Sequence, residues 1–498
     1  MADFDAVVIG AGNAGLTAAA TLQRAGARTL LVERHNVPGG SGTSFRRGRF
    51  EFEVALHQLS GVGVDHQPGL RTGLFRDLDI VDRLEFVQES ELYRAFVPGQ
   101  VDLTLPAGWG AAVDTIEDAF PGNGIRARAF FDLVRKVTVW QTAAQRGRPG
   151  DQLDPLLFAY GLRSAKDVLD EFFDDDRLKF ALGAYWTYLG QPPSQLPFLD
   201  FAMILYVYVQ FKPWHIRGGS QAMSSAILDS FLRAGGTVRF NTSVHGINTD
   251  GTRVTGIRLD DGETVSAAEV VSNASLPSTY AMLEGIAVPS AARRDLGSRR
   301  VGVSGFVLHM GLDASAAELG FTTSTSLLAA STDDDVTFAA ARSLEPTRLV
   351  CLSSYDVAPI GFAPSGATHV SLTTLHYADP WTRLAPAEYA RAKFAYAETL
   401  LDMVEHMTPG IRDVIEEVDV ATPLTMMRYL GHPGGAIYGY QQDFTETWLF
   451  RDSDKNSHVP GLHLAGAWTV MGGFQPTLIA GARVAQQILR TARTETTA

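Results

Sequence analysis

The sequence predicts an α/β protein in which a discontinuous Rossmann-like domain is interrupted by an inserted α+β domain of mixed sheet plus helices. A strand, a glycine-rich turn, a helix and a second strand follow one another in the first 33 residues. A block of short strands begins near residue 237, and a strand, a glycine turn and a helix close the chain after residue 461. Because 498 residues exceed what one hydrophobic core supports, more than one domain is expected.

The opening strand, helix and strand are predicted from their side-chain patterns. Residues 4–9 (FDAVVI) are a short apolar run, residues 14–25 are rich in alanine and leucine, and residues 29–32 are again apolar. These compositions are typical of a strand, a helix and a second strand. Glu33 ends the second strand, where an acidic side chain of a parallel β-α-β unit reaches a ribose.

A glycine fingerprint, G-x-G-x-x-G, lies between the first strand and the helix. Gly10 allows a tight turn, Gly12 lets the backbone approach a pyrophosphate, and Gly15 packs the helix on the strand. A diphosphate then lies at the positive end of the helix. With strand, helix and acid in register, the motif predicts dinucleotide binding rather than an ordinary β-α-β turn. The doublet Gly39–Gly40 gives a second close approach of backbone, which favours a flavin over a nicotinamide.

Composition excludes several classes of function. The 42 basic and 55 acidic residues give a net charge of −13, which argues against nucleic-acid binding because phosphates require a basic face. The single cysteine, Cys351, excludes an internal disulfide and a cysteine metal cluster, and no metal site is expected. The sequence holds no G-x-S-x-G elbow, so a serine hydrolase has no support.

The chain is expected to stay in the cytoplasm. Asp3 and Asp5 stand where an export signal would carry basic residues. The longest nearly apolar run, residues 198–211, contains Asp200 and is shorter than the roughly 20 residues needed to span a bilayer. We interpret this run as a buried strand or helix, as an apolar wall for a substrate, or as a patch that contacts a membrane surface.

Helical and strand-like stretches alternate between the two ends of the chain. Residues 45–52 alternate well enough for a strand or hairpin, and residues 71–214 are predicted to be a mostly helical insertion. A second insertion, of sheet plus helix, is expected after residue 299, and the polar tail 491–498 is expected to fray. Helices are expected at residues 111–120, 126–146, 164–173, 220–234, 386–406 and 475–490, and strands at residues 237–240, 246–249, 253–259, 264–266, 269–272, 301–310, 348–355, 369–375 and 461–465.

Four longer segments carry a family resemblance. They are NVPGGSGTSFRRGRFEFEVALHQLSG (36–61), WHIRGGSQAM (214–223), TPLTMMRYLGHPGGAIYGY (422–440) and GLHLAGAWTVMGGFQPTLIAGARVA (461–485). The sequence resembles the FAD-dependent amine oxidase and phytoene desaturase superfamily over nearly its whole length, and these segments resemble its carotenoid isomerase and retinol saturase branch. The resemblance implies a GR2-type FAD-binding domain made of residues 1–70, 215–290 and 455–498, and a substrate-binding domain made of residues 71–214 and 291–454.

The same resemblance implies which residues contact FAD. The fingerprint and Glu33 would hold the ADP half, the glycine doublet would follow the pyrophosphate, and the closing turn would cover the flavin. A helix that begins near Gln475 would point free N–H groups at the flavin and stabilise the negative charge of its reduced form. The full set is Gly10, Gly12, Gly15, Glu33, Arg34, Gly39, Gly40, Thr43, Ser44, Val244, Gly466, Gly473, Phe474, Gln475 and Thr477.

One position departs from the family pattern. Many relatives have an arginine directly after the glycine doublet, whereas this chain has Ser41. The pyrophosphate contact at that position would then fall to Arg46 or Arg47.

His57 and Tyr438 are the candidate catalytic residues. His57 lies in the phrase EVALHQL, where the retinol saturase branch also has a histidine, and its ordinary pKa near 6.5 suits acid/base chemistry. Tyr438 lies in a Gly/Pro-rich stretch that the family places above the flavin, and Trp468 in the closing turn would shield the ring. Ordinary packing is the alternative for each of these side chains.

We therefore expect an FAD-dependent oxidoreductase that desaturates, isomerises or saturates a carbon–carbon bond in an apolar, polyene- or isoprenoid-like small molecule. A flavin amine or amino-acid oxidase on the same fold is one alternative, because fold does not fix function. A non-catalytic lipid carrier like the Rab GDP-dissociation inhibitors is another. No second complete glycine fingerprint follows a later strand, so reoxidation is expected to fall to oxygen, a quinone or another acceptor.

Overall fold

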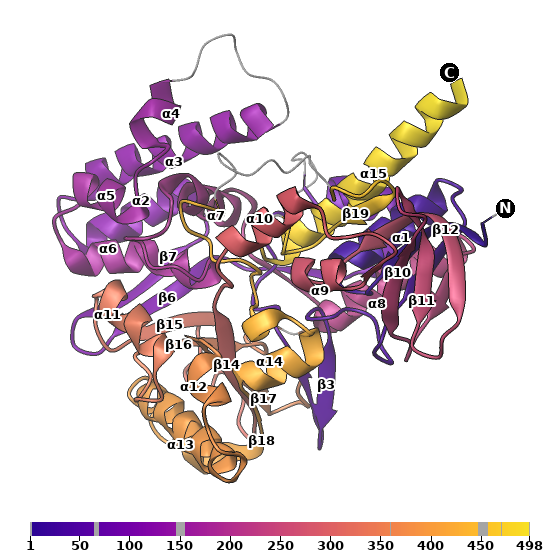
Figure 1. Ribbon diagram of the computed structural model, residues 1–498. Helices are drawn as coiled ribbons and strands as arrows, with labels where there is room; N and C mark the ends of the chain where they lie inside the picture. Colours follow the sequence, from indigo (N-terminus) through magenta and orange to yellow (C-terminus); the bar gives the residue numbers. More distant parts are fainter. Residues whose placement is uncertain are drawn as a thin grey trace.

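The computed structural model describes residues 2–63, 69–145, 155–358, 360–446, 457–469 and 471–497. Two large sheets lie side by side, with a layer of helices above the second sheet and a long C-terminal helix beside the first (Figure 1). The predicted α/β class with an inserted mixed sheet is confirmed. No helix in these ranges is long and apolar enough to cross a membrane.

The first sheet contains the opening and closing strands of the chain. Its central strand β1 runs parallel to both β2 and β12, and the last strand β19 pairs with β12. Parallel strands end at one edge, so the turns after β1, β2 and β12 meet there. In order, the strands are β13 (Leu283–Glu284), β10 (Val244–Thr249), β11 (Val254–Leu259), β12 (Thr264–Ser272), β1 (Phe4–Ile9), β2 (Thr29–Val32) and β9 (Thr237–Arg239), with β19 (Leu462–Leu464) beside β12.

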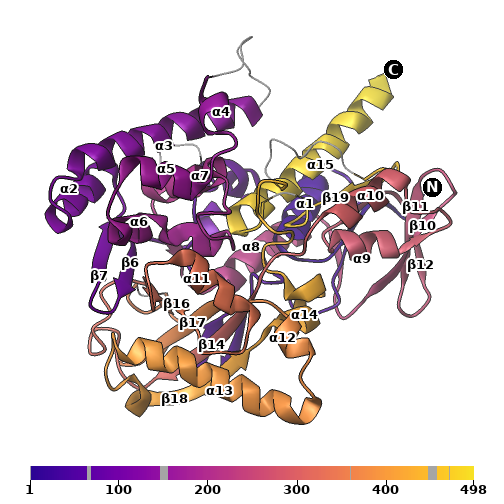
Figure 2. The ribbon, with the colours of Figure 1, turned by 60° about the vertical axis from the view of Figure 1, so that its left-hand side comes forward.

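Helix α1 (Asn13–Arg24) packs closely against the C-terminal helix α15 (Phe474–Thr497), and the two labels lie next to each other in Figure 2. A side chain at Gly481 would overlap the carbonyl oxygen of Ala14, so the helices meet backbone to backbone. Thr17 Oγ1 also donates a hydrogen bond of 2.9 Å to the carbonyl of Leu478. This contact holds the two ends of the chain together.

The second sheet is built from strands far apart in the sequence. Helix α13 (Pro386–Glu405) packs on one face, through the cluster that includes Phe306, Leu352 and Tyr396. The opposite face is turned toward the first sheet. In order, the strands are β18 (Ile415–Ala421), β14 (Ser304–Leu312), β17 (Thr368–His376), β16 (Leu349–Ser354), β15 (Thr325–Ala329), β6 (Glu91–Val97) and β7 (Val101–Pro106).

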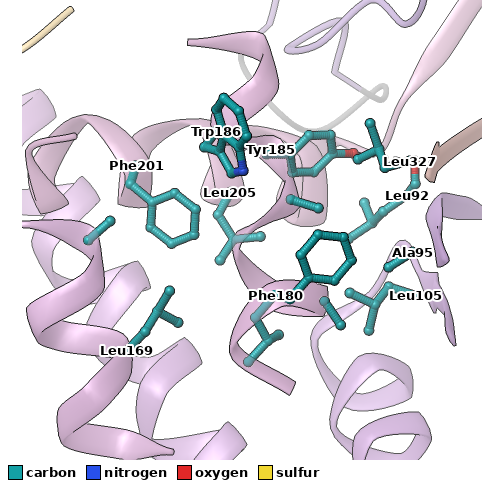
Figure 3. Close-up of a cluster of buried hydrophobic side chains, with 14 of the residues drawn as sticks. Leu92, Ala95, Leu105, Leu169, Phe180, Tyr185, Trp186, Phe201, Leu205 and Leu327 are labelled. Atoms are coloured by element: carbon teal, nitrogen blue, oxygen red, sulfur yellow. Dashed lines mark hydrogen bonds between the residues drawn. The ribbon is translucent and has the colours of Figure 1, made fainter. Parts of the chain in front are cut away.

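The helical layer shares a core with the β6–β7 edge of the second sheet. Figure 3 shows strand residues such as Leu92 and Leu105 on one side of this core, helix residues such as Phe201 and Leu205 on the other, and Phe180 between them. The long apolar run is a helix, α7 (Phe198–Phe211), and not a strand. The other helices are α2 (Trp109–Ala119), α3 (Gly124–Gln145), α4 (Pro155–Tyr160), α5 (Ala165–Phe172) and α6 (Asp176–Gly183).

Shorter elements join these layers. Two pairs of short antiparallel strands lie outside the large sheets, and further helices connect the strands. The paired strands are β3 (Ser44–Arg47) with β4 (Phe50–Glu53) and β5 (Phe86–Gln88) with β8 (Trp214–Ile216), and the helices are α8 (Gly219–Arg233), α9 (Leu276–Ala281), α10 (Ser290–Ser298), α11 (Asp334–Ala339), α12 (Asp379–Thr382) and α14 (Pro423–Leu430).

Several elements differ from the sequence prediction. The β6–β7 hairpin lies inside the stretch predicted to be mostly helical, because Glu91 and Arg94 interrupt its apolar pattern. Strands β15 and β18 and helix α14 were not predicted, and residues 264–272 form one strand instead of two. Helix α15 continues to Thr497, so the tail predicted to fray is helical. The predicted helix end at residue 146 and the domain boundary near residue 455 lie outside the described residues.

Candidate functional site

A cavity of about 1140 Å³ opens where the strands of the first sheet end and face the second sheet. In open α/β sheets this edge is where ligands bind. The cavity brings together residues from both ends of the chain and from both insertions. Of the residues predicted from the sequence, it is lined by His57 and Tyr438 and by Gly10, Gly12, Glu33, Arg34, Gly39, Gly40, Val244, Gly473, Phe474, Gln475 and Thr477.

The two glycine turns lie directly on each other at the bottom of the cavity. Gly12 and Gly39 form a parallel bridge, and the N–H of Gly39 donates a hydrogen bond of 2.8 Å to the carbonyl of Ala11. A side chain at Gly15 would overlap the carbonyl oxygen of Gly10. Gly39 has a φ of +125°, which favours glycine. Bare backbone therefore faces the cavity, as a diphosphate requires.

Glu33 lies at the predicted ribose position. Its side chain is buried, with one carboxylate oxygen accepting a hydrogen bond of 2.6 Å from the N–H of Ala11 and the other accepting one of 2.9 Å from the N–H of His35. A carboxylate has about four acceptor positions, so these bonds leave capacity for ribose hydroxyls in the cavity. The backbone bonds also fix the direction of the carboxylate.

The N-terminus of α15 closes the other side of the cavity. Gly473 has a φ of +107° and turns the chain into the helix, and Asn13 Nδ2 of α1 reaches Thr477 Oγ1 at 3.5 Å. Among the described residues, Asn13 Oδ1 and Trp468 Nε1 are buried polar atoms without a hydrogen-bond partner, and both residues line the cavity. A flavin dinucleotide offers both donors and acceptors, so these atoms fit such a group.

Four predicted cofactor residues do not line the cavity. Gly15 and Gly466 shape its wall from behind, and a side chain at Gly466 would come within 2.6 Å of Asn273 Oδ1. Thr43 Oγ1 donates a hydrogen bond of 2.5 Å to Gln221 Oε1, and Ser44 Oγ donates to Glu51. Asn13 and Asn273 were not predicted from the sequence. Their positions could have indicated them, because Asn13 directly follows Gly12 of the fingerprint and Asn273 directly follows β12.

The expectation that Arg46 or Arg47 replaces the missing arginine is wrong. Ser41 lines the cavity, but Arg46 and Arg47 are exposed on strand β3 and lie outside it. Arg46 pairs with Glu51 at 2.8 Å, and Arg47 pairs with Asp419 at 2.9 Å. Hairpin geometry explains the difference, because the strand carries both guanidinium groups away from the glycine turns.

The cavity continues from the nucleotide-binding turns into an apolar compartment. Helix α7 supplies one wall and the inner face of the second sheet supplies the other. The apolar lining residues of these walls are Met203, Ile204, Val207, Val307, Leu349 and Leu375, and Leu189 and Ile437 add to them from neighbouring loops. The interpretation of the 198–211 run as a wall of a substrate compartment therefore fits the geometry.

His57 lies on the lining between the two parts of the cavity. Its Nε2 is 3.5 Å from Thr373 Oγ1, and its Nδ1 is 3.9 Å from the Sγ of Cys351. Burial, with a smaller contribution from His215, lowers the pKa of His57 from 6.5 to about 4. The expectation of an ordinary pKa is therefore wrong, and the imidazole is neutral at pH 7. Burial also raises the pKa of the Cys351 thiol to about 12, so it stays protonated.

Tyr438 lies against the closing turn. A side chain at Gly472 would come within 2.6 Å of the Tyr438 Cα, and the Tyr438 hydroxyl donates a hydrogen bond of 3.3 Å to the carbonyl of Thr187. Burial raises the pKa of Tyr438, so its hydroxyl remains a donor. Trp468 is buried in the same turn, with its ring edge-on to His432 at 5.5 Å and to Tyr440 at 4.9 Å.

Comparison with known proteins agrees with this geometry. The family model for flavin-containing amine oxidoreductases matches residues 13–489 of the chain. The chain belongs to this family. As a flavin-containing oxidoreductase it uses FAD. The glycine turns, Glu33 and the N-terminus of α15 line one cavity.

Two curated proteins and one solved structure illustrate what this flavin-containing oxidoreductase is similar to. The chain is 28% identical to phytoene dehydrogenase of Streptomyces griseus, over 97% of this chain and 94% of the relative. It is 24% identical to all-trans-retinol 13,14-reductase of Danio rerio, over 96% of this chain and 84% of the relative. The structure of wild-type putrescine oxidase bound to putrescine shares the fold, with a TM-score of 0.66, 16% identity and coverage of 98% and 99% of the two chains.

Replacing Glu33 should weaken FAD binding to this oxidoreductase. Glu33→Ala removes the ribose acceptor and leaves two backbone N–H groups unpaired, so we expect at least a tenfold rise in the FAD dissociation constant and a loss of about 1–3 kcal/mol in apoprotein stability. FAD titration and thermal unfolding of the apoprotein measure the two effects. Glu51→Ala, on the β3–β4 hairpin outside the cavity, is the matched control. An unchanged FAD affinity in Glu33→Ala would show that Glu33 does not bind the ribose.

The low pKa of His57 makes stability depend on pH. The unfolded chain takes up this proton below pH 6.5, whereas the folded protein takes it up only near pH 4, so stability is full above pH 6.5 and falls as the pH drops from 6.5 to 4. Water in the cavity reduces the effect, which we expect to be about 2 kcal/mol. Urea unfolding at pH 7.5 and 4.5 measures how much unfolding free energy the protein loses on acidification. This loss should be about 2 kcal/mol smaller in His57→Gln than in the wild type. Equal sensitivity would contradict a neutral, buried imidazole.

Proposed function

We propose that this FAD enzyme changes the oxidation state or geometry of a carbon–carbon bond in an apolar, polyene- or isoprenoid-like substrate. The observation that carries the proposal is the continuity of the cavity. The nucleotide-binding turns open directly into a compartment walled by Met203, Ile204 and Val207 of α7 and by apolar residues of the second sheet. A long hydrocarbon gains free energy when it leaves water for such walls. The named activities of the relatives are of the same kind.

His57 and Tyr438 lie at the junction between the nucleotide-binding turns and the apolar compartment, where they could assist the reaction. FAD supplies hydride transfer in this kind of chemistry. His57 is held between Thr373 and Cys351 and presents a neutral imidazole that can accept a proton from a substrate carbon. Tyr438 keeps its proton and can only donate a hydrogen bond. Both side chains line the cavity, so an apolar substrate that fills it would displace water from them and protect a reactive carbon centre from side reactions.

Oxidation of an amine is the second candidate function. Asp200 is only 3% exposed and lines the cavity on α7 beside the apolar residues. An acidic side chain in the wall is suited to contact a cationic group, as an ammonium substrate would require. The fold shared with putrescine oxidase is compatible with either function, because fold alone does not fix the substrate. Apolar side chains make up most of the two walls, so we favour the hydrocarbon.

Anaerobic flavin reduction tests the choice. We expect the flavin absorbance to bleach on mixing with one or more members of a panel of polyenes and isoprenoids, and to stay unchanged with amines. If the enzyme works in the saturating direction, the chemically reduced flavin should reoxidise anaerobically with an unsaturated member of the same panel. Bleaching by amines and by no polyene or isoprenoid would overturn the proposal.

The same assay tests the two junction residues. His57→Gln should slow the flavin step by about 10²- to 10⁴-fold if the imidazole accepts a proton, and Tyr438→Phe should slow it less, because only one hydrogen bond is lost. Full activity in His57→Gln would show that His57 only packs in the cavity wall and takes no part in the reaction.

We also propose that the enzyme is cytoplasmic and contacts a membrane surface to collect its apolar substrate. Phe158 of α4 is 74% exposed, and Leu162, in the turn that follows α4, is 71% exposed. Helix α4 lies at the outer edge of the helical layer (Figure 1). Two exposed apolar side chains so close together are suited to insert between lipids. Co-sedimentation with neutral phospholipid vesicles should fall at least fivefold in Phe158→Glu/Leu162→Glu. Equal sedimentation of the variant would contradict this contact.

A further inference from the structure

The C-terminus of helix α14 is bound to the loop that follows β2. Arg34 donates hydrogen bonds of 2.5 Å to the carbonyl of Tyr429 and of 3.3 Å to the carbonyl of Arg428. The Nε2 of His35 lies 2.8 Å from the same Tyr429 carbonyl, and the two rings stack with centroids 5.9 Å apart. One short loop thus holds the last turn of a helix that lies almost 400 residues further along the chain.

Charge and shape both favour this contact. The last carbonyls of a helix carry partial negative charge, so the guanidinium of Arg34 is attracted to them. Gly431 ends α14 in the left-handed region with a φ of +67°, and a side chain there would come within 2.9 Å of Arg34 Nη1. The carbonyl of His35 accepts a hydrogen bond of 3.0 Å from the N–H of Asn241, which fixes the loop from the other side.

The segment that begins with α14 follows the cavity from one end to the other. Tyr429, Leu430 and Gly431 line it beside Glu33, at the ribose position. Further along the segment, the His432 ring packs on Trp468, and a side chain at Gly439 would come within 2.5 Å of the carbonyl oxygen of Ala467. Residues 422–440 therefore form a strap that runs from the ribose acid to the closing turn.

We propose that Arg34 and His35 form a latch that holds this strap closed along the adenosine side of the FAD site, and that the latch must open for FAD to enter or leave. Both residues line the cavity next to Glu33, yet the hydrogen bonds of their side chains go to strap carbonyls. They are positioning residues that act on FAD through the strap. The proposal uses the family's cofactor and does not depend on the substrate.

A latch has a kinetic signature that a direct cofactor contact lacks. Opening precedes both entry and exit, so breaking the latch should accelerate FAD association and dissociation by the same factor. Losing a side chain that only contacts FAD should accelerate dissociation and leave association unchanged. For Arg34→Ala/His35→Ala we expect both rate constants to rise about tenfold, since charge-assisted hydrogen bonds are lost, while the dissociation constant changes less than threefold.

The exchange experiment uses quenching of flavin fluorescence after mixing apoprotein with FAD, and its recovery after dilution of the holoprotein. Arg47→Ala is the matched control, because it removes an ion pair with Asp419 that also joins the first part of the chain to the second sheet but lies outside the cavity. Both rate constants of this control should match the wild type. Tyr429→Ala keeps the carbonyl and removes the ring stack on His35 together with the contact of Arg428 over the ring, so it should give a smaller acceleration of both steps.

The outcomes separate the possibilities. Faster dissociation with unchanged association in the double variant would overturn the latch and make Arg34 or His35 a direct FAD contact. Equal acceleration in Arg47→Ala would also overturn it, because any contact between the two parts would then have the same effect. Both rate constants are measured without substrate, so this test remains valid even if the proposed reaction on polyenes is not observed. Circular dichroism of each apoprotein checks that the variants are folded.

Discussion

The site depends on close contacts between main-chain segments that have no side chain between them. At the N-terminal end, Gly15 lets α1 approach the turn at Gly10, and near the C-terminal end, Gly481 lets α15 approach Ala14 of the same helix. These two contacts place the N-termini of α1 and α15 on one cavity. The positive ends of both helices then face the same space, one suited to a diphosphate and the other to a reduced flavin.

The inner face of the second sheet divides into an apolar part and a polar part. Val307, Leu349 and Leu375 line the cavity. Further along the strands, Ser371 Oγ lies 2.9 Å from the Nδ1 of His309 and 3.2 Å from the Nε2 of His369. Burial lowers the pKa of His309 to about 3 and that of His369 well below its usual value, so this polar part is neutral. The sheet thus borders the substrate compartment without adding charge to it.

The sequence predicts the nucleotide-binding half of the site well and the rest less well, for physical reasons. Local patterns set β2, whose observed bounds are the predicted residues 29–32, and they place Glu33 at its end. The environment of His57 depends on Thr373 and Cys351, which lie about 300 residues away, so its low pKa has no local signal. Helix α14 is flanked by prolines and glycines that suggest a loop, and its stability comes from tertiary packing and from the Arg34 and His35 contacts.

We infer that the two ends of the chain jointly build one FAD site. Spectroscopic titration of the purified apoprotein with FAD tests this most directly. We expect flavin absorbance bands that shift on binding and a titration that saturates at equimolar FAD. A protein that is colourless as purified and acquires no bound flavin at saturating FAD would contradict it.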